Sequence, residues 1–143
     1  MKTFPSIMLL AAGLCGANFT ARAADTNAPA AAAPAAKKAA TLVETEAAEK
    51  LLADKKIVVL DVRTADEFAA GHIAGATNLD FRAPDFKAKV AALPKDRVYL
   101  VNCAVGGRSA RACELMGTLA FPTIYDLKGG IRAWQAAGKP LVK

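Results

Sequence analysis

Residues 98–113, VYLVNCAVGGRSARAC, decide the fold of this chain. They open with Val98–Val101, a continuous apolar run that is typical of a strand buried on both faces of a parallel sheet. Cys103 stands at the carboxyl end of that strand, and a helix is predicted from about Ser109 to Leu119. Ligand sites in open α/β sheets lie at the carboxyl ends of the strands, so this loop is the candidate site.

The loop after Cys103 has the composition of an anion-binding turn. Gly106 and Gly107 permit backbone angles that other residues resist, and a tight turn directs successive backbone N–H groups inward. The start of the helix, Arg108 and Ser109 add positive charge and a hydrogen-bond donor. These features favour a thiolate, the nucleophilic form of cysteine. A buried structural cysteine beside a glycine turn is the alternative that the loop alone leaves open.

On both sides of this segment, predicted strands alternate with predicted helices. This alternation favours right-handed crossovers and a parallel sheet that is covered on both faces. The expected strands are 57–60, 77–79, 98–101 and 123–125. The expected helices begin at Thr45 and Thr64, run from Phe86 to Leu93 before Pro94, and extend over 109–119 and 131–137.

Four motifs in this region resemble those of the rhodanese family, in the same order and at the usual spacing. They are Leu60-Asp61-Val62-Arg63 with Glu67-Phe68, Gly71-His72-Ile73-Ala74-Gly75-Ala76, Cys103-Ala104-Val105-Gly106-Gly107-Arg108-Ser109, and Leu127-Lys128-Gly129-Gly130-Ile131-Arg132-Ala133-Trp134. The resemblance implies one rhodanese-like α/β domain over residues 41–143, with a five-stranded parallel sheet and helices on both faces.

The resemblance also implies sulfur transfer through a persulfide on Cys103, the expected catalytic residue. The expected substrate-binding residues form the rest of the loop: Ala104, Val105, Gly106, Gly107, Arg108 and Ser109. No metal and no organic cofactor is expected. Many family members carry a cation directly after the cysteine, whereas this chain has Ala104 and Val105. The rim of the loop is therefore predicted to be less cationic, which leaves room for donors less anionic than thiosulfate.

Other residues of the motifs are interpreted as structural. Asp61 and Arg63 are expected to pair with neighbours such as Glu67 and to fix the turn from strand to helix. His72 is expected to be structural rather than a partner of Cys103 in a catalytic dyad.

Two further residues are assigned to the core. Cys113 lies inside the predicted helix, too far from Cys103 for an unstrained disulfide, and is read as a free thiol in the core. Trp134 is likewise read as a core residue.

The amino-terminal residues have the pattern of a secretory signal peptide. Lys2 precedes an apolar run from Ile7 to Phe19, and Ala21-Arg22-Ala23 forms a cleavage site, so residues 1–23 are predicted to be removed. An uncleaved anchor is the alternative. Residues 24–40, rich in alanine and proline, are predicted to be a disordered tether. We therefore expect a periplasmic or secreted protein with no membrane contact after cleavage.

The composition of the chain excludes several classes of partner and site. The net charge is +6, but the basic residues do not form the stripe that nucleic-acid binding needs. Three cysteines and one histidine are too few for a disulfide scaffold or an ordinary Cys/His metal site. The expected partners are a small sulfur-containing donor and a thiol or cyanide acceptor, with a protein as a further candidate acceptor.

Three hypotheses follow for the function. The first is a sulfurtransferase that takes sulfur from thiosulfate or a persulfide. The second is a persulfide carrier or redox-partner module with little free turnover. The third is a relative of phosphatases or arsenate reductases. Four residues separate Cys103 from Arg108, the short loop of sulfurtransferases, whereas the phosphatase relatives have five. This spacing argues against the third hypothesis.

Overall fold

The computed structural model describes residues 38–143. In this part of the chain five strands form one parallel sheet in the order β1-β5-β4-β2-β3. The strands are β1 (Thr41–Val43), β2 (Ile57–Asp61), β3 (Thr77–Asn78), β4 (Val98–Asn102) and β5 (Thr123–Leu127). The predicted five-stranded parallel sheet is thus confirmed.

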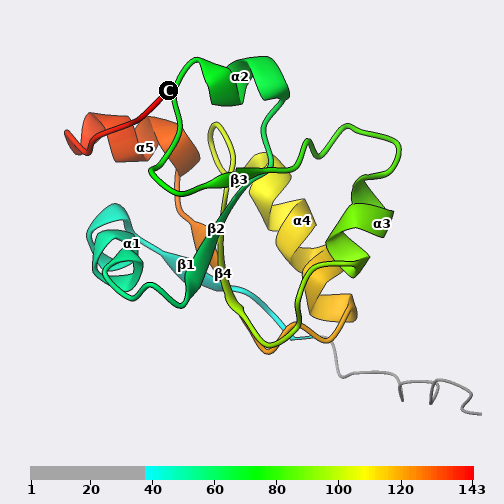
Figure 1. The fold of residues 1–143 in the computed structure, drawn as a ribbon. Coiled ribbons are helices and arrows are strands. Elements are labelled where there is room, and N and C mark those ends of the chain that lie inside the picture. The colour runs from blue at the N-terminus through cyan, green and yellow to red at the C-terminus, as the bar shows by residue number, and fades with distance from the viewer. Residues whose placement is uncertain (1–37) are drawn as a thin grey trace, which may run out of the picture. The chain divides into compact units, whose positions relative to one another are not determined.

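Helices cover both faces of the sheet, as Figure 1 shows. They are α1 (Thr45–Leu52), α2 (Ala65–Ala69), α3 (Phe86–Ala91), α4 (Gly107–Thr118) and α5 (Gly130–Ala136). In that view α1 and α5 lie on one side of the sheet and α3 and α4 on the other, while α2 lies beyond the carboxyl ends of the strands. The prediction of a doubly covered sheet is therefore also confirmed.

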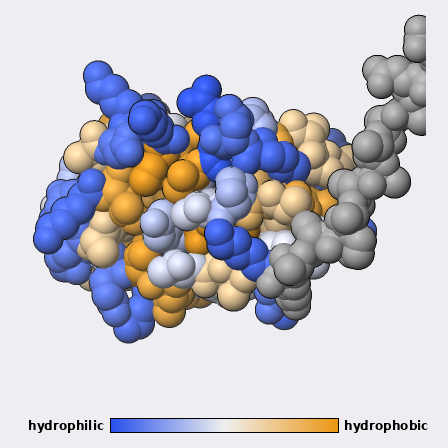
Figure 2. Space-filling model, turned by 90° about the horizontal axis from the view of Figure 1, so that it is seen from below, coloured by the Kyte–Doolittle hydropathy of each residue, from blue (hydrophilic) through white to orange (hydrophobic). Residues whose placement is uncertain are grey.

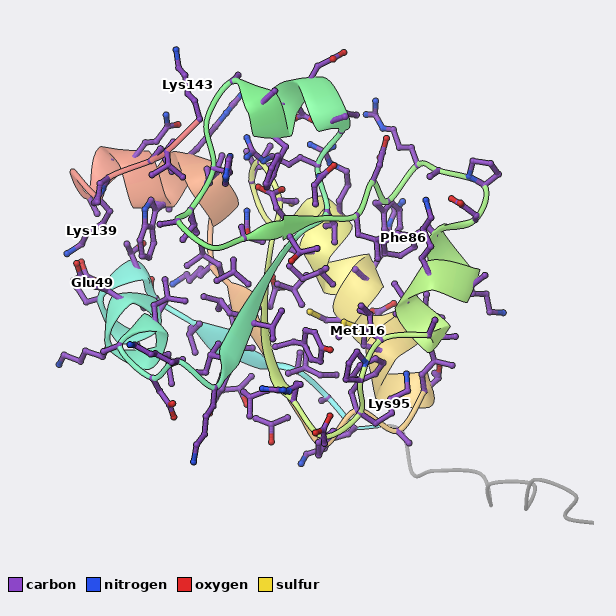
Figure 3. All side chains as sticks on the ribbon, viewed as in Figure 1. Glu49, Phe86, Lys95, Met116, Lys139 and Lys143 are labelled. Carbon is purple, nitrogen blue, oxygen red and sulfur yellow. The ribbon has the colours of Figure 1, made fainter. Side chains whose placement is uncertain are left out.

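The central strand β4 contributes to two hydrophobic layers because its side chains alternate between the faces. Tyr99 and Val101 pack in the layer that contains Met116 of α4 and Phe86 of α3. Figure 3 shows both Met116 and Phe86 directed toward the sheet. Leu100 packs in the opposite layer. Burial on both faces explains why β4 is a continuous apolar run in the sequence.

Several element boundaries differ from those predicted. Helix α4 begins at Gly107 rather than Ser109, because Gly106 adopts a left-handed conformation that lets the helix start directly after it. Helix α1 begins at Thr45, as predicted, and Glu44 holds its cap position. Thr64 does cap α2, through a reciprocal capping box with Glu67.

The amino ends of the strands lie opposite the candidate site, and Figure 2 shows this end of the molecule with hydrophobic side chains between hydrophilic ones. Here the Lys95 ammonium lies 3.5 Å from the centre of the Phe121 ring. This cation–π contact covers one edge of the aromatic layer in which Tyr99 and Phe121 meet edge to face.

The predicted signal peptide, 1–23, and most of the predicted tether lie outside the described residues. The last residues of that tether are described, and the Lys38 backbone N–H donates to the Gly117 carbonyl oxygen at 3.3 Å. Ala40 packs against the layer that contains Met116. Between residues 38 and 143, no helix has the length and apolar character to cross a membrane.

Candidate active site

Cys103 follows the last residue of β4 and lies inside the loop that leads to α4. Its side chain packs among the core residues and is 1% exposed. Its Sγ accepts a hydrogen bond from the Gly106 backbone N–H at 3.1 Å. The structure therefore directs a loop amide at the sulfur, as the glycine-containing turn predicts.

Helix α5 holds the other side of this loop. The N–H groups of Ile131 and Arg132 donate to the carbonyl oxygens of Cys103 and Ala104 at 2.8 and 3.2 Å. Gly130 makes this approach possible. A Cβ at this position would lie 2.8 Å from the Ala104 carbonyl carbon and would collide with the Cys103 carbonyl oxygen. The φ of Gly130 is +59°, in the left-handed region. With the carbonyl groups bound to α5, the N–H groups of the loop are left to face the sulfur.

Hydrogen bonds lower the pKa of the Cys103 thiol. Burial on its own raises the pKa, because it penalises the charged form. The amide and side chain of Ser109 and the amides of Val105 and Gly106 act in the opposite direction and outweigh burial. The pKa of Cys103 therefore lies below its ordinary value of 9.0. Such a thiol is more often a thiolate near neutral pH, which is the form that attacks sulfur.

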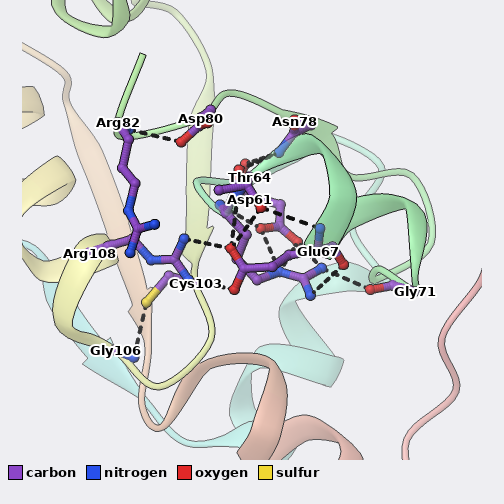
Figure 4. Close-up of polar contacts among 11 residues, drawn as sticks. Asp61, Thr64, Glu67, Gly71, Asn78, Asp80, Arg82, Cys103, Gly106 and Arg108 are labelled. Carbon is purple, nitrogen blue, oxygen red and sulfur yellow. Dashed lines mark hydrogen bonds and ion pairs between the residues drawn. The ribbon is translucent and has the colours of Figure 1, made fainter. Parts of the chain in front are cut away.

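Arg108 is bound by a carboxylate instead of facing the loop as a free cation. Its two terminal nitrogens donate to the two Glu67 carboxylate oxygens, each at 2.7 Å (Figure 4). This bidentate pair, with help from Thr64, lowers the pKa of Glu67 to about 2. Arg108 still interacts electrostatically with Cys103. The positive charge that the sequence predicts at Arg108 is therefore largely neutralised locally by Glu67.

A buried ion pair supports the α2 side of the site. Arg63 Nη2 lies 2.6 Å from Asp61 Oδ2, with side chains 6% and 0% exposed. Arg63 also donates to the carbonyl oxygens of Glu67 and Gly71, at 2.9 and 2.8 Å. This one guanidinium ties the end of β2 to the middle of α2 and to the turn that follows it, in agreement with the structural role predicted for Asp61 and Arg63. Arg63 binds only the backbone carbonyl of Glu67, whose carboxylate binds Arg108.

Cys113 takes the place predicted for it. Among the described residues, Cys103 and Cys113 are both free thiols, and burial raises the pKa of Cys113. It is therefore a core thiol and not a second nucleophile. Trp134, 4% exposed, also lies in the core.

His72 is held in a structural position. Its ring stacks on the Phe68 ring with the centroids 3.8 Å apart, and its Nδ1 lies 3.1 Å from the Phe68 carbonyl oxygen. Its backbone pairs with Val142 at the end of the chain. These contacts agree with the structural reading of His72. Residues 38–143 contain no group of three acidic, cysteine or histidine side chains placed to hold a metal ion.

The turn after β3 adds two charged residues that the sequence pattern does not single out. The Arg82 backbone N–H donates to Asp80 Oδ1 at 2.8 Å, and Asp80 interacts electrostatically with Arg108. Figure 4 shows the Arg82 side chain extending from this turn toward Arg108 and the Cys103 loop. An Asp two residues before an Arg is a weak sequence signal for a turn, and it gives no indication of which loop the turn will face.

Comparison with known proteins places this geometry in a family. Residues 44–137 match the Rhodanese-like domain family. A sulfurtransferase of Allochromatium vinosum is 34% identical over 101 residues, which cover 70% of this chain and 92% of the relative. The thiosulfate sulfurtransferase GlpE of Stutzerimonas stutzeri is 35% identical over 79 residues, 54% of this chain and 70% of the relative.

A solved structure agrees with these relatives. The crystal structure of a rhodanese-related protein from Thermoplasma volcanium superimposes with a TM-score of 0.65 at 33% identity. The match covers 71% of this chain and 97% of that one.

Proposed function

This chain belongs to the rhodanese-like domain family, and from that premise we propose that it is a sulfurtransferase that carries sulfane sulfur as a persulfide on Cys103. The observation that carries the proposal is the Cys103 sulfur itself. It is buried at the end of β4, receives the Gly106 N–H at 3.1 Å, and has a lowered thiol pKa. We place the rest of the substrate-binding site in the loop from Ala104 to Ser109.

The proposed reaction has two nucleophilic displacements at sulfur. The Cys103 thiolate attacks the outer sulfur of thiosulfate, a new S–S bond forms, and the original S–S bond breaks. Sulfite leaves with the electron pair, so the protein now carries a persulfide anion. A thiolate or cyanide then attacks the terminal sulfur, takes it, and releases the Cys103 thiolate. No electrons enter or leave overall, and no cofactor is required.

The loop is suited to both resting states of this cycle. Thiolate and persulfide each carry one negative charge, and the N–H groups that face the sulfur stabilise such a charge without rearranging. The hydrogen bonds from α5 to the Cys103 and Ala104 carbonyl oxygens hold these N–H groups in place. The same loop therefore supports donor attack and acceptor attack in turn.

Mass spectrometry tests the proposal directly. After incubation with thiosulfate, the peptide that contains Cys103 is expected to gain one sulfur atom, and addition of cyanide is expected to remove it as thiocyanate. The Cys113 peptide serves as the internal control, because that thiol is buried and has a raised pKa. If thiosulfate and persulfide donors both leave Cys103 unmodified, the proposed function is wrong.

A persulfide carrier is the second candidate, and one exposed side chain favours it. Val105 is 57% exposed, although it is apolar and stands two residues after Cys103. A partner that docks over Cys103 to receive its sulfur would cover this apolar side chain. Steady-state turnover with thiosulfate and cyanide separates the two candidates. A carrier forms the persulfide once but turns over slowly with free cyanide.

We also propose that the protein is exported to the periplasm or secreted after removal of residues 1–23. The support is the charged start, the apolar run and the Ala21-Arg22-Ala23 site. Expression of the full chain in a bacterial host is expected to yield a protein that begins at or near Ala24. Amino-terminal sequencing of the recovered protein checks this. A cytoplasmic product that still begins at Met1 would contradict it.

A further inference from the structure

We propose that Arg82 is the residue that binds the anionic end of the sulfur donor above the Cys103 loop. This inference rests on the proposed function, which it deepens by assigning the donor class as a small anion such as thiosulfate. Arg82 lies outside the segment 103–109, and the cation missing at Ala104 and Val105 is supplied here from the turn between β3 and α3.

The backbone around Arg82 is fixed on both sides. Phe81 donates its N–H to the Val62 carbonyl oxygen at 3.3 Å, and its ring meets the Phe86 ring edge-on at 5.0 Å. Ala83 donates to the Asp80 carbonyl oxygen at 3.1 Å, which closes the turn. Because Phe81 packs inward against the core, its neighbour Arg82 is presented outward, beside the loop.

The Arg82 guanidinium is free to take a ligand. Arg82 is exposed, and within residues 38–143 no carboxylate or carbonyl oxygen accepts a hydrogen bond from its side chain. Its contact with Asp80 is made by the backbone N–H. In Figure 4 the guanidinium extends toward Arg108 on the side of Cys103. Its donors thus remain available for the oxygens of a bound anion, a geometry to which arginine is suited.

Local charge gives Arg82 its importance. Arg108 is held by both oxygens of Glu67, and Asp80 adds a second carboxylate close to Arg108. Without Arg82, the charges of Arg108, Glu67 and Asp80 add up to a net negative charge, to which the Cys103 thiolate adds another. A dianion such as thiosulfate is repelled by that arrangement. Arg82 offsets the excess, so it is expected to affect capture of the donor rather than the displacement at sulfur.

Steady-state kinetics of three variants test this role. At low salt, Arg82→Gln is expected to raise the KM for thiosulfate about fivefold and to change kcat less than twofold, as suits one partly screened charge. Arg82→Lys is expected to recover most of the loss. Arg97→Gln is the matched control, since it removes the charge of another exposed arginine, at the amino end of β4. The difference between Arg82→Gln and wild type is expected to shrink as salt is added.

Alkylation of Cys103 gives a readout that does not depend on sulfur transfer. Iodoacetate is an anion and iodoacetamide is neutral, so the ratio of their rates reports how strongly the loop attracts negative charge. Arg82→Gln is expected to lower this ratio several-fold, measured on the Cys103 peptide, and Arg97→Gln is expected to leave it unchanged.

The kinetic measurement and the alkylation ratio together distinguish failure of the proposed sulfurtransferase function from failure of the role assigned to Arg82. If wild type takes no sulfur from any donor, the proposed function fails, and the alkylation ratio alone decides whether Arg82 captures anions. An unchanged ratio in Arg82→Gln overturns the role of Arg82. A lowered ratio with an unchanged KM, in an enzyme that turns over thiosulfate, overturns it as well.

Discussion

Cys103→Ser is expected to abolish sulfur transfer, while Cys113→Ser retains most of it. The serine hydroxyl at 103 is not ionised near neutral pH and forms no persulfide, so the first displacement has no nucleophile. Cys113 is 3% exposed inside α4, and burial raises the pKa of its thiol. Thiocyanate formation from thiosulfate and cyanide, followed over time for both variants, measures the contrast.

Circular dichroism and thermal unfolding provide the control for this pair. Cys113→Ser places a hydroxyl in an apolar layer and is expected to lower stability by about 1–3 kcal/mol. Cys113→Ala avoids the polar group and keeps the comparison interpretable. If both cysteine positions proved equally necessary in folded variants, a cycle that uses two cysteines would replace the persulfide mechanism.

Arg63→Met is expected to lower the free energy of unfolding by about 3–5 kcal/mol. Asp61 is fully buried and would keep a carboxylate with no opposing charge. The change also removes the donors to the Glu67 and Gly71 carbonyl oxygens. Because small domains are stable by only about 5–15 kcal/mol, such a loss is severe. Urea unfolding followed by circular dichroism at neutral pH measures it.

Two further variants show how much of the loss in Arg63→Met comes from the buried ion pair with Asp61. Lys89→Met removes one partner of an exposed pair in which Lys89 of α3 lies 2.9 Å from Asp85, the residue that precedes the helix. This change is expected to cost less than about 1 kcal/mol. Arg63→Lys keeps the charge but loses the planar fork, so its loss should fall between the other two. A loss for Arg63→Met no larger than that for Lys89→Met would show that the buried pair contributes little to stability.

The sequence predicts a part of the fold well where a single local property determines the structure, such as a continuous apolar run or glycines at a turn. Strand β4 is continuous and apolar because both of its faces are covered, and the cysteine loop carries its glycines where the backbone turns. Strand β1 shows no such pattern. It has three residues, of which Val43 is buried and Leu42 is 59% exposed. Its place in the sheet comes from pairing with β5, a tertiary contact that no local pattern records.

The candidate site also depends on tertiary contacts that no local sequence pattern records. Cys103 and its loop can be identified from one continuous segment, whereas the charges around the loop come from distant ones. Arg108 is recognisable as a cation, but its binding to Glu67, far away in sequence, becomes visible when α2 and α4 are placed. Arg82 belongs to neither segment, and nothing in its neighbours distinguishes it from other surface arginines.

The order of the strands also dictates when the reactive loop is complete. The first strand, β1, pairs with β5, the last one, so the sheet stays open at that edge until nearly the whole chain is available. The N–H groups that hold the Cys103 and Ala104 carbonyl oxygens belong to Ile131 and Arg132, and Val142 completes the pairing with His72. A partly synthesised chain therefore has its cysteine but not the environment that activates it. If the proposed export carries the chain across a membrane before it folds, the Cys103 loop is completed only after translocation.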